Sequence, residues 1–188
     1  MLWQREVGEG YSGPLVEGDR IWVQARQGGE EVVYSVMLDT GKTLWNQRYK
    51  APFKQDPSAE AHGLGPYSTP ALANGRLFTF SVTSVLSAWD AYKGTLLWRK
   101  EYSEDFKPSY PLYGTAASPL VWEDRCFAAF GSSGREELDE KGAIVALRVS
   151  DGSEIWRWDG DGPALAASPV IAVVEGAPQL VSKTEENI

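Results

Sequence analysis

Residues 87–98 read SAWDAYKGTLLW: a β-rich run, a turn that contains glycine, and a tryptophan four residues after that glycine. The ending Gly-x-x-x-Trp occurs twice more, in residues 41–45 (GKTLW) and 152–156 (GSEIW), so the tryptophans recur after 53 and 58 residues. A repeat of about 50 residues is too long for a leucine-rich or helical-hairpin unit and is typical of one four-stranded blade of a β-propeller.

A second landmark, a proline after a small residue, opens each unit. Apolar residues, a turn and another β-rich run follow it, as in residues 14–23 (PLVEGDRIWV) and 70–80 (PALANGRLFTF). Because proline suits the first residue of a strand, and Asn-Gly and Gly-Asp suit tight turns, each segment is expected to form a hairpin. The landmark occurs at Pro14, Pro70, Pro119 and Pro169.

Two further strands complete each unit. Residues 32–36, 85–89 and 143–147 are rich in β-branched, aromatic and other apolar residues and are expected to be third strands, and the fourth strands end in the repeated tryptophans. No stretch of ten residues has a helical period, so no helix beyond a turn or two is expected, and residues 52–66 and 103–111 are expected to be loops between blades.

The predicted fold is an all-β, incomplete β-propeller of about three and a half antiparallel four-stranded blades in a single domain, residues 1–188. Its approximate units are 1–8 (the tail of a preceding blade), 9–50, 65–102, 114–160 and 165–188 (the start of a next blade, with a second strand at 181–185). Since a propeller closes with roughly 4 to 8 blades, the chain is expected to be part of a longer protein and to associate when isolated.

Composition narrows the partner classes. A net charge of −8 and an isoelectric point near 4.8, with no basic stripe, argue against nucleic acid. The single cysteine, Cys126, excludes an internal disulfide and is interpreted as a small buried residue. No apolar run is long enough for a membrane-spanning helix, and residues 1–6 lack the apolar core of a signal peptide.

The repeat resembles the tryptophan-docking motif of pyrroloquinoline-quinone-like β-propellers, roughly Ala-x-Asp-x-x-Thr-Gly-x-x-x-Trp. Residues 88–98 are the closest copy, with Lys93 in place of the usual threonine. The resemblance implies that each tryptophan packs against the backbone of a neighbouring blade, which is a structural role. Met37 and Arg148 stand where Asp90 does, so their turns are expected to differ in shape. The implied docking residues are Trp45, Trp98, Trp156, Gly41, Gly94, Gly152 and Asp90.

The family implies two functional branches: periplasmic quinone-dependent alcohol and sugar dehydrogenases, and non-enzymatic scaffolds such as the lipoprotein subunit of the outer-membrane β-barrel assembly machinery. This chain looks closer to the scaffolds. The dehydrogenases usually carry adjacent cysteines and a calcium ion near the cofactor, and this chain has one cysteine. No cofactor is therefore predicted; pyrroloquinoline quinone with calcium is the alternative.

Few residues suggest catalysis or the binding of a metal or another ligand. Asp159 and Asp161 lie in an Asp-Gly-Asp-Gly run that offers carboxylates to a hard cation, but the run is interpreted as a turn. His62, the only histidine, lies in a Gly-rich approach to an inner strand and is a candidate rim or ligand contact without a catalytic partner. Residues 8–13 match the dinucleotide fingerprint GxGxxG, but Pro14 and a strand follow where that motif needs a helix.

Two hypotheses remain open at this stage. The first is a non-enzymatic propeller that presents loops and strand edges to a protein partner, or to missing blades of its parent, in the bacterial periplasm or cell envelope; the location rests on the resemblance. The second is a fragment of a quinone-dependent alcohol or sugar dehydrogenase whose cofactor residues lie in other blades.

Overall fold

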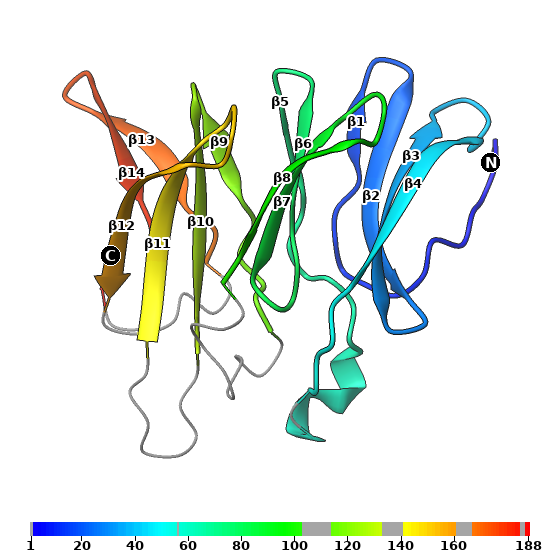
Figure 1. The fold of residues 1–188 in the computed structure, drawn as a ribbon, viewed down its shortest axis with the longest axis horizontal. Coiled ribbons are helices and arrows are strands. Elements are labelled where there is room, and N and C mark those ends of the chain that lie inside the picture. The colour runs from blue at the N-terminus through cyan, green and yellow to red at the C-terminus, as the bar shows by residue number, and fades with distance from the viewer. Residues whose placement is uncertain (1, 56, 103–113, 133–140, 161–166, 185–186) are drawn as a thin grey trace.

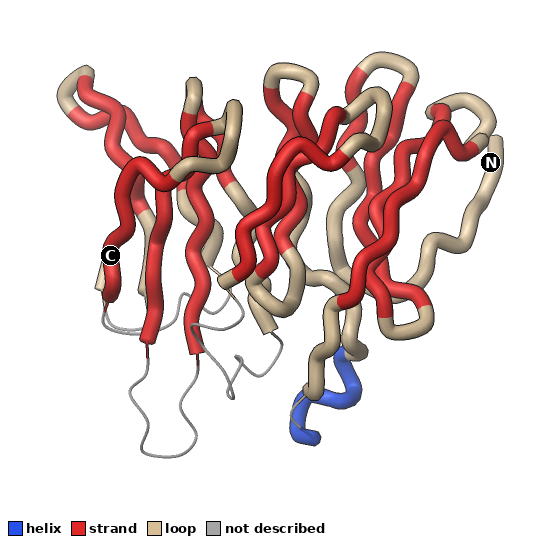
Figure 2. Tube along the Cα trace, in the orientation of Figure 1, coloured by secondary structure: helices blue, strands red, loops and turns tan. Residues whose placement is uncertain are grey.

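The structure, a computed structural model, describes residues 2–55, 57–102, 114–132, 141–160, 167–184 and 187–188. These residues form three four-stranded antiparallel sheets and one two-stranded sheet (Figures 1 and 2). The first sheet contains β1 (Leu15–Glu17), β2 (Arg20–Gln27), β3 (Glu30–Met37) and β4 (Thr43–Lys50); the second contains β5 (Ala71–Ala73), β6 (Arg76–Phe80), β7 (Val85–Asp90) and β8 (Leu96–Glu101); the third contains β9 (Leu120–Trp122), β10 (Arg125–Ser132), β11 (Lys141–Arg148) and β12 (Glu154–Gly160); the last contains β13 (Val170–Val174) and β14 (Ala177–Val181).

Each four-stranded sheet is a meander in which strands pair in sequence order. The sheets stand side by side in a row that does not close (Figure 1). Short connections between β-rich strands that follow one another make each meander locally determined, so the repeat in the sequence becomes a repeat in space. The predicted all-β, incomplete propeller is therefore confirmed, and we call the four-stranded sheets blades 1, 2 and 3.

The proline landmarks immediately precede the first strand of every sheet. The residues before them also join neighbouring sheets. The Gly13 amide donates to Thr69 Oγ1 at 3.0 Å, the Thr69 amide to Ser118 Oγ at 2.9 Å, and the Ser118 amide to Ser168 Oγ at 2.9 Å. The landmark thus marks a chain of hydrogen bonds from sheet to sheet as well as the start of a strand.

The hydrophobic core lies between the sheets. One cluster packs blade 1 against blade 2 and includes Trp22, Val33 and Leu77. A larger cluster packs blade 2 against blade 3 and includes Phe80, Tyr102 and Phe130. The rings of Tyr102 and Phe130 stack with their centroids 4.4 Å apart. Because blade 2 packs against blade 1 on one face and blade 3 on the other, much of the stability comes from contacts between repeats, as in other repeat architectures.

Two details differ from the expected strands and loops. The loop after blade 1 contains a short 3-10 helix, η1 (Pro57–His62), which lies below the sheets in Figure 1. The second strand of the last sheet is β14, not residues 181–185, of which 185 lies outside the described residues. Glu175 and Gly176 both have positive φ, as a tight hairpin requires, and this turn fixes the register with Pro178 opposite Val173. Proline is tolerated there because the sheet has only two strands.

The described part of the chain contains no helix long and apolar enough to cross a membrane.

Candidate functional site

The turns between the third and fourth strands share one backbone geometry. In blade 2 the Gly94 amide donates to the Asp90 carbonyl at 2.8 Å, and the Asp90 amide donates to the Thr95 carbonyl at 2.8 Å. The corresponding bonds in blades 1 and 3 are Gly41 to Met37 and Met37 to Lys42, and Gly152 to Arg148 and Arg148 to Ser153. The expectation that these turns differ in shape is therefore wrong, because main-chain bonds and a glycine with positive φ set the turn in all three.

The acidic residues of these turns differ in position and still bind the turn backbone. Asp90 Oδ1 accepts hydrogen bonds from the Tyr92 and Lys93 amides at 3.0 and 2.8 Å. Asp151 Oδ1 accepts one from the Ser153 amide at 2.8 Å. A hydrogen bond from the Ser153 side chain, followed by this bond from its backbone amide, lowers the pKa of Asp151. Both carboxylates therefore stabilise a turn, and neither is arranged around a ligand.

Tryptophans contact these glycines from the preceding blade. A Cβ atom added to Gly94 would lie 2.6 Å from the Trp45 ring, and one on Gly152 would lie 2.7 Å from the Trp98 ring. Trp45 Nε1 donates to the Ala91 carbonyl at 2.9 Å, and Trp98 Nε1 donates to that of Val149 at 3.0 Å. Only glycine leaves room for an indole ring this close to the turn.

Trp3 makes the same contact one step earlier. Its ring lies 2.7 Å from where a Cβ of Gly41 would be, and its Nε1 donates to the Leu38 carbonyl at 2.8 Å. The segment around Trp3 is not a strand, yet it seals the outer side of blade 1 together with Val7. No Gly-x-x-x-Trp motif precedes Trp3, so the tryptophan itself was the only sign of this contact in the sequence.

Trp156 holds the corresponding place on β12, opposite Ala146 as Trp98 is opposite Ala88. It stays 36% exposed, whereas Trp45 and Trp98 are 9% and 8% exposed. Other exposed apolar side chains occur on β12 and β13, and we call this set the C-terminal end: Trp156, Trp158, Val170, Val173 and Val174. Beside it, a groove of about 420 Å³ runs between blade 3 and β14, lined by Ile144, Trp158 and Leu180 among others.

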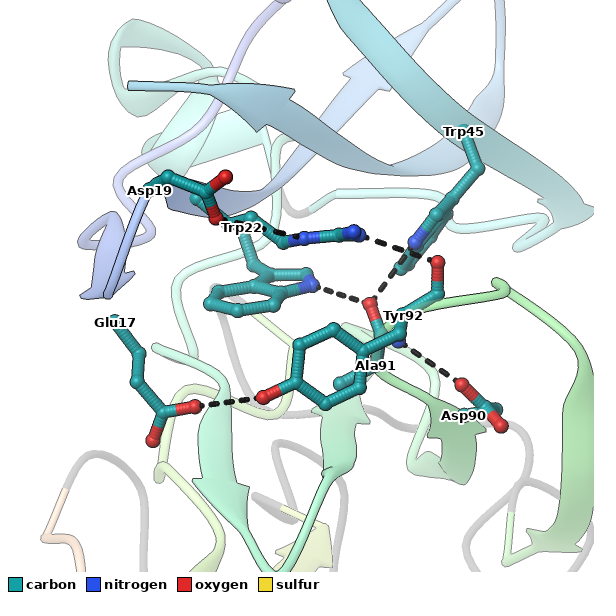
Figure 3. A network of polar contacts seen from close by, with 8 residues as sticks. Glu17, Asp19, Trp22, Trp45, Asp90, Ala91 and Tyr92 are labelled. Atoms are coloured by element: carbon teal, nitrogen blue, oxygen red, sulfur yellow. Dashed lines mark hydrogen bonds and ion pairs between the residues drawn. The ribbon is translucent and has the colours of Figure 1, made fainter. Parts of the chain in front are cut away.

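A second set of contacts surrounds the turn of blade 2 (Figure 3). Trp22 Nε1 donates to the same Ala91 carbonyl as Trp45, at 2.8 Å. The Tyr92 hydroxyl donates to Glu17 at 3.1 Å, and the Arg20 guanidinium donates to the Tyr92 carbonyl at 3.2 Å while lying 5.0 Å from the centre of its ring. Blade 1 therefore holds the Tyr92 side chain and backbone at once.

A buried carboxylate joins blades 1 and 2 at the other end of the sheets. Glu31 is fully buried and accepts hydrogen bonds from the Tyr49 hydroxyl at 2.7 Å, Gln24 Nε2 at 3.0 Å, the Val82 amide at 3.0 Å and the Ser81 hydroxyl at 3.2 Å. Burial raises the pKa of Glu31 despite these bonds, and burial together with the neighbouring Glu31 raises that of Tyr49. The cluster fastens two blades through polar groups.

Comparison with known proteins places these features in a family. Residues 29–187 match the family described as outer membrane protein assembly factor BamB. The chain belongs to the BamB family. Outer membrane protein assembly factor BamB of Shewanella oneidensis is 28% identical over 116 residues, which covers 58% of this chain and 27% of that protein. This chain thus spans about a quarter of that relative's length.

Solved structures of two kinds share the fold. BamB from Moraxella catarrhalis superposes with a TM-score of 0.59 and 17% identity, covering all of this chain and 53% of that one. A europium-containing methanol dehydrogenase superposes with a TM-score of 0.58 and 25% identity, covering 82% of this chain and 25% of that one. BamB-type and quinoprotein-type propellers are therefore both structural relatives.

The two candidate ligands for a hard cation are Asp159 and Asp161. Asp159 Oδ1 is paired with Arg157 Nε at 2.7 Å, and Asp161 lies outside the described residues. Across the described ranges, no three His, Cys, Asp or Glu side chains gather closely enough to hold a metal ion. The Cys126 thiol is buried, which raises its pKa to about 12.

His62 lies exposed at the end of η1, and its carbonyl accepts a hydrogen bond from the Tyr67 hydroxyl at 3.1 Å. The structure thus places His62 on the loop after blade 1, away from the turns between the third and fourth strands, which we call the docking turns (Figure 1). The aromatic side chains of Trp22, Tyr34 and Trp89 are buried and offer no binding face. Tyr92 is partly exposed and belongs to the contacts of Figure 3.

Sequence reasoning missed the Glu31 cluster and the contacts of Arg20. One sequence feature could have indicated a buried role for Glu31: this charged residue stands at the start of an apolar, β-rich run. The structure shows that both faces of this strand, β3, are buried. Its partners Ser81 and Val82 lie 50 and 51 residues away. No spacing rule predicts that pairing.

Proposed function

We propose that this chain is part of a non-enzymatic β-propeller scaffold that binds protein partners during outer-membrane protein assembly in the bacterial periplasm. The observation that carries the proposal is the family match over residues 29–187, which takes in most of blades 1 to 3. The kind of partner is supported by the description of the matched family, and the periplasmic location by the resemblance stated from the sequence.

The use of the repeat residues supports a scaffold. The tryptophans, glycines and acids that recur in the sequence hold blade to blade or shape turns. Apolar surface remains exposed at the C-terminal end, where Val173 is 70% exposed. Exposed apolar surface rimmed by polar residues is typical of sites where proteins associate.

A binding experiment tests the scaffold proposal. The outer-membrane protein assembly machinery of the source cell is purified without this subunit, and its binding to the immobilised chain is followed by biolayer interferometry. We expect saturable binding that Val173→Asp weakens at least tenfold, with Leu96→Asp, an exposed residue of blade 2, as the matched control. Absence of saturable binding, or equal binding by both variants, would contradict this role for the C-terminal end.

A second candidate is a propeller segment of a quinone-dependent dehydrogenase. It is favoured by the 25% identity with the methanol dehydrogenase over 82% of this chain. Calorimetry with pyrroloquinoline quinone and calcium tests it. Micromolar binding that is abolished by Asp159→Asn or His62→Ala would place this candidate first, and we expect none because these residues are apart and Asp159 is paired with Arg157.

A further inference from the structure

The interface between blades 1 and 2 and the one between blades 2 and 3 use the same positions with different residues. Arg20 and Arg76 each begin the second strand of their blade, opposite Glu17 and Ala73 respectively. Tyr92 and Ser150 each lie two residues before the docking glycine of the following blade. The first interface is therefore an internal template for the second.

At the first interface the Tyr92 side chain fills the space between the blades. Its ring meets Trp22 edge-on with centroids 6.2 Å apart, and Arg20 lies over its face. The same Arg20 donates a hydrogen bond to the Tyr92 carbonyl. One arginine thus contacts both the aromatic ring and the backbone of a single residue.

At the second interface the corresponding space is a cavity. Because Ser150 is small, a pocket of about 410 Å³ remains between the two blades, within the size range of ligand sites. It is lined by Asn74, Arg76, Glu123, Asp124, Arg148, Val149 and Ser150. The Arg76 Nε atom is buried and has no hydrogen-bond partner within the described part of the chain.

We propose that this pocket binds an aromatic side chain of a partner polypeptide, in the place that Tyr92 fills one blade earlier. Arg76 takes the role of Arg20 over the ring, and its unpaired Nε atom donates to a carbonyl of the occupant. A ring close to a carbonyl is what an aromatic residue of a peptide offers. An unpaired buried arginine atom is unfavourable, so the occupant also satisfies a group that the chain leaves without a partner.

This inference deepens the proposed function, on which it rests for the class of partner, but its test does not use the assembly machinery. The full chain, labelled with ¹⁵N, is titrated with N-acetyl-L-phenylalanine amide, and the backbone amides of Asn74, Asp124 and Ser150 are followed by NMR. We expect saturable shifts at these amides. N-acetyl-L-leucine amide, which has the carbonyl without the ring, should bind at least fivefold more weakly.

Variants locate the site. Ser150→Tyr fills the pocket from within the chain and should reduce binding of the phenylalanine probe at least tenfold, whereas Ser150→Ala should leave it unchanged. Tyr92→Ser opens the template position and should add a second set of shifts around Gly18 and Arg20. Arg76→Gln should weaken binding at the pocket.

Shifts that persist in Ser150→Tyr, equal binding of the leucine probe, or no saturable shift in the unaltered chain would overturn the proposal. If Ser150→Tyr does not fold, the gain of a second site in Tyr92→Ser decides. Probe binding without binding to the assembly machinery would reject the proposed function alone, and the reverse result would reject the pocket alone.

Discussion

At the residue scale, the tryptophans of this chain differ in their surroundings. Trp98 is almost fully buried, is hydrogen-bonded to the Val149 carbonyl and lies on Gly152. Trp122, at the end of β9, is only partly buried. Context in space, rather than residue type, sets what each tryptophan contributes to stability.

Replacing Trp98 should therefore be far more damaging than replacing Trp122. We expect Trp98→Ala to lower the free energy of unfolding by about 3–5 kcal/mol, because it leaves a cavity between blades 2 and 3. Trp122→Ala should lower it by a clearly smaller amount. Denaturant titration measures both, and equal losses would mean that the contact with Gly152 adds nothing to stability.

Glu31 should make stability depend on pH. Its pKa is raised in the folded state, so the folded chain binds this proton more tightly than the unfolded chain does. The free energy of unfolding then falls as pH rises from the ordinary carboxyl pKa through the raised one. Glu31→Gln should lack that fall, while Glu30→Gln, one residue outside the cluster, should retain it. Melting curves across this pH range test the difference, and parallel curves for the unaltered chain and Glu31→Gln would contradict it.

At the scale of the elements, the docking turn is the unit that joins one sheet to the next. Its backbone bonds are the same in all three blades although the side chains differ. Glycine is required for two reasons at this position, a positive φ and the close approach of an indole ring. Gly18, Gly28 and Gly29 meet only the first requirement, because a Cβ on any of them would meet nothing within 4 Å.

Gly94→Ala and Gly28→Ala separate these two requirements. Both glycines have positive φ, but a Cβ on Gly28 would meet nothing within 4 Å, whereas one on Gly94 would lie 2.6 Å from the Trp45 ring. We expect Gly28→Ala to lose roughly 1–2 kcal/mol of stability from the backbone alone. Gly94→Ala should lose more because the ring must move. Chemical unfolding of the two variants decides, and equal losses would show that the turn tolerates displacement of the ring.

At the scale of the whole molecule, the two ends of the row of sheets differ in how much apolar surface they expose. Trp3 and Val7 cover blade 1, and Trp45 and Trp98 are covered by the next blade. The C-terminal end exposes two tryptophans and three valines. These five exposed side chains lie on β12 of blade 3 and on β13 of the last sheet.

The isolated chain is therefore expected to self-associate. Sedimentation velocity should show species larger than the monomer whose proportion grows with concentration. Trp158→Lys should reduce association, and Leu96→Lys, an exposed position on the outer strand of blade 2, should not. A chain that stays monomeric at high concentration, or equal behaviour of the two variants, would count against association through this end.

The sequence by itself determined the fold and the period of the array. The Gly-x-x-x-Trp endings and the proline landmarks are local patterns, and each meander forms from strands that follow one another, so pattern and structure coincide. The positions of the third strands follow from the same local rule. The exception is β14. Its position is set by the two-residue turn at Glu175 and Gly176, even though the strand contains Pro178.

Only the tertiary structure decided which copies of the motif are buried, what pairs with Glu31, and where a pocket lies. Glu31 meets Ser81 and Val82, and Trp98 meets Val149, across about 50 residues of chain. The pocket is lined by residues of two repeats, among them Arg76 of blade 2 and Ser150 of blade 3. These properties depend on the volume and charge of residues in two different repeats, and their meeting is set by how the sheets pack rather than by either repeat alone.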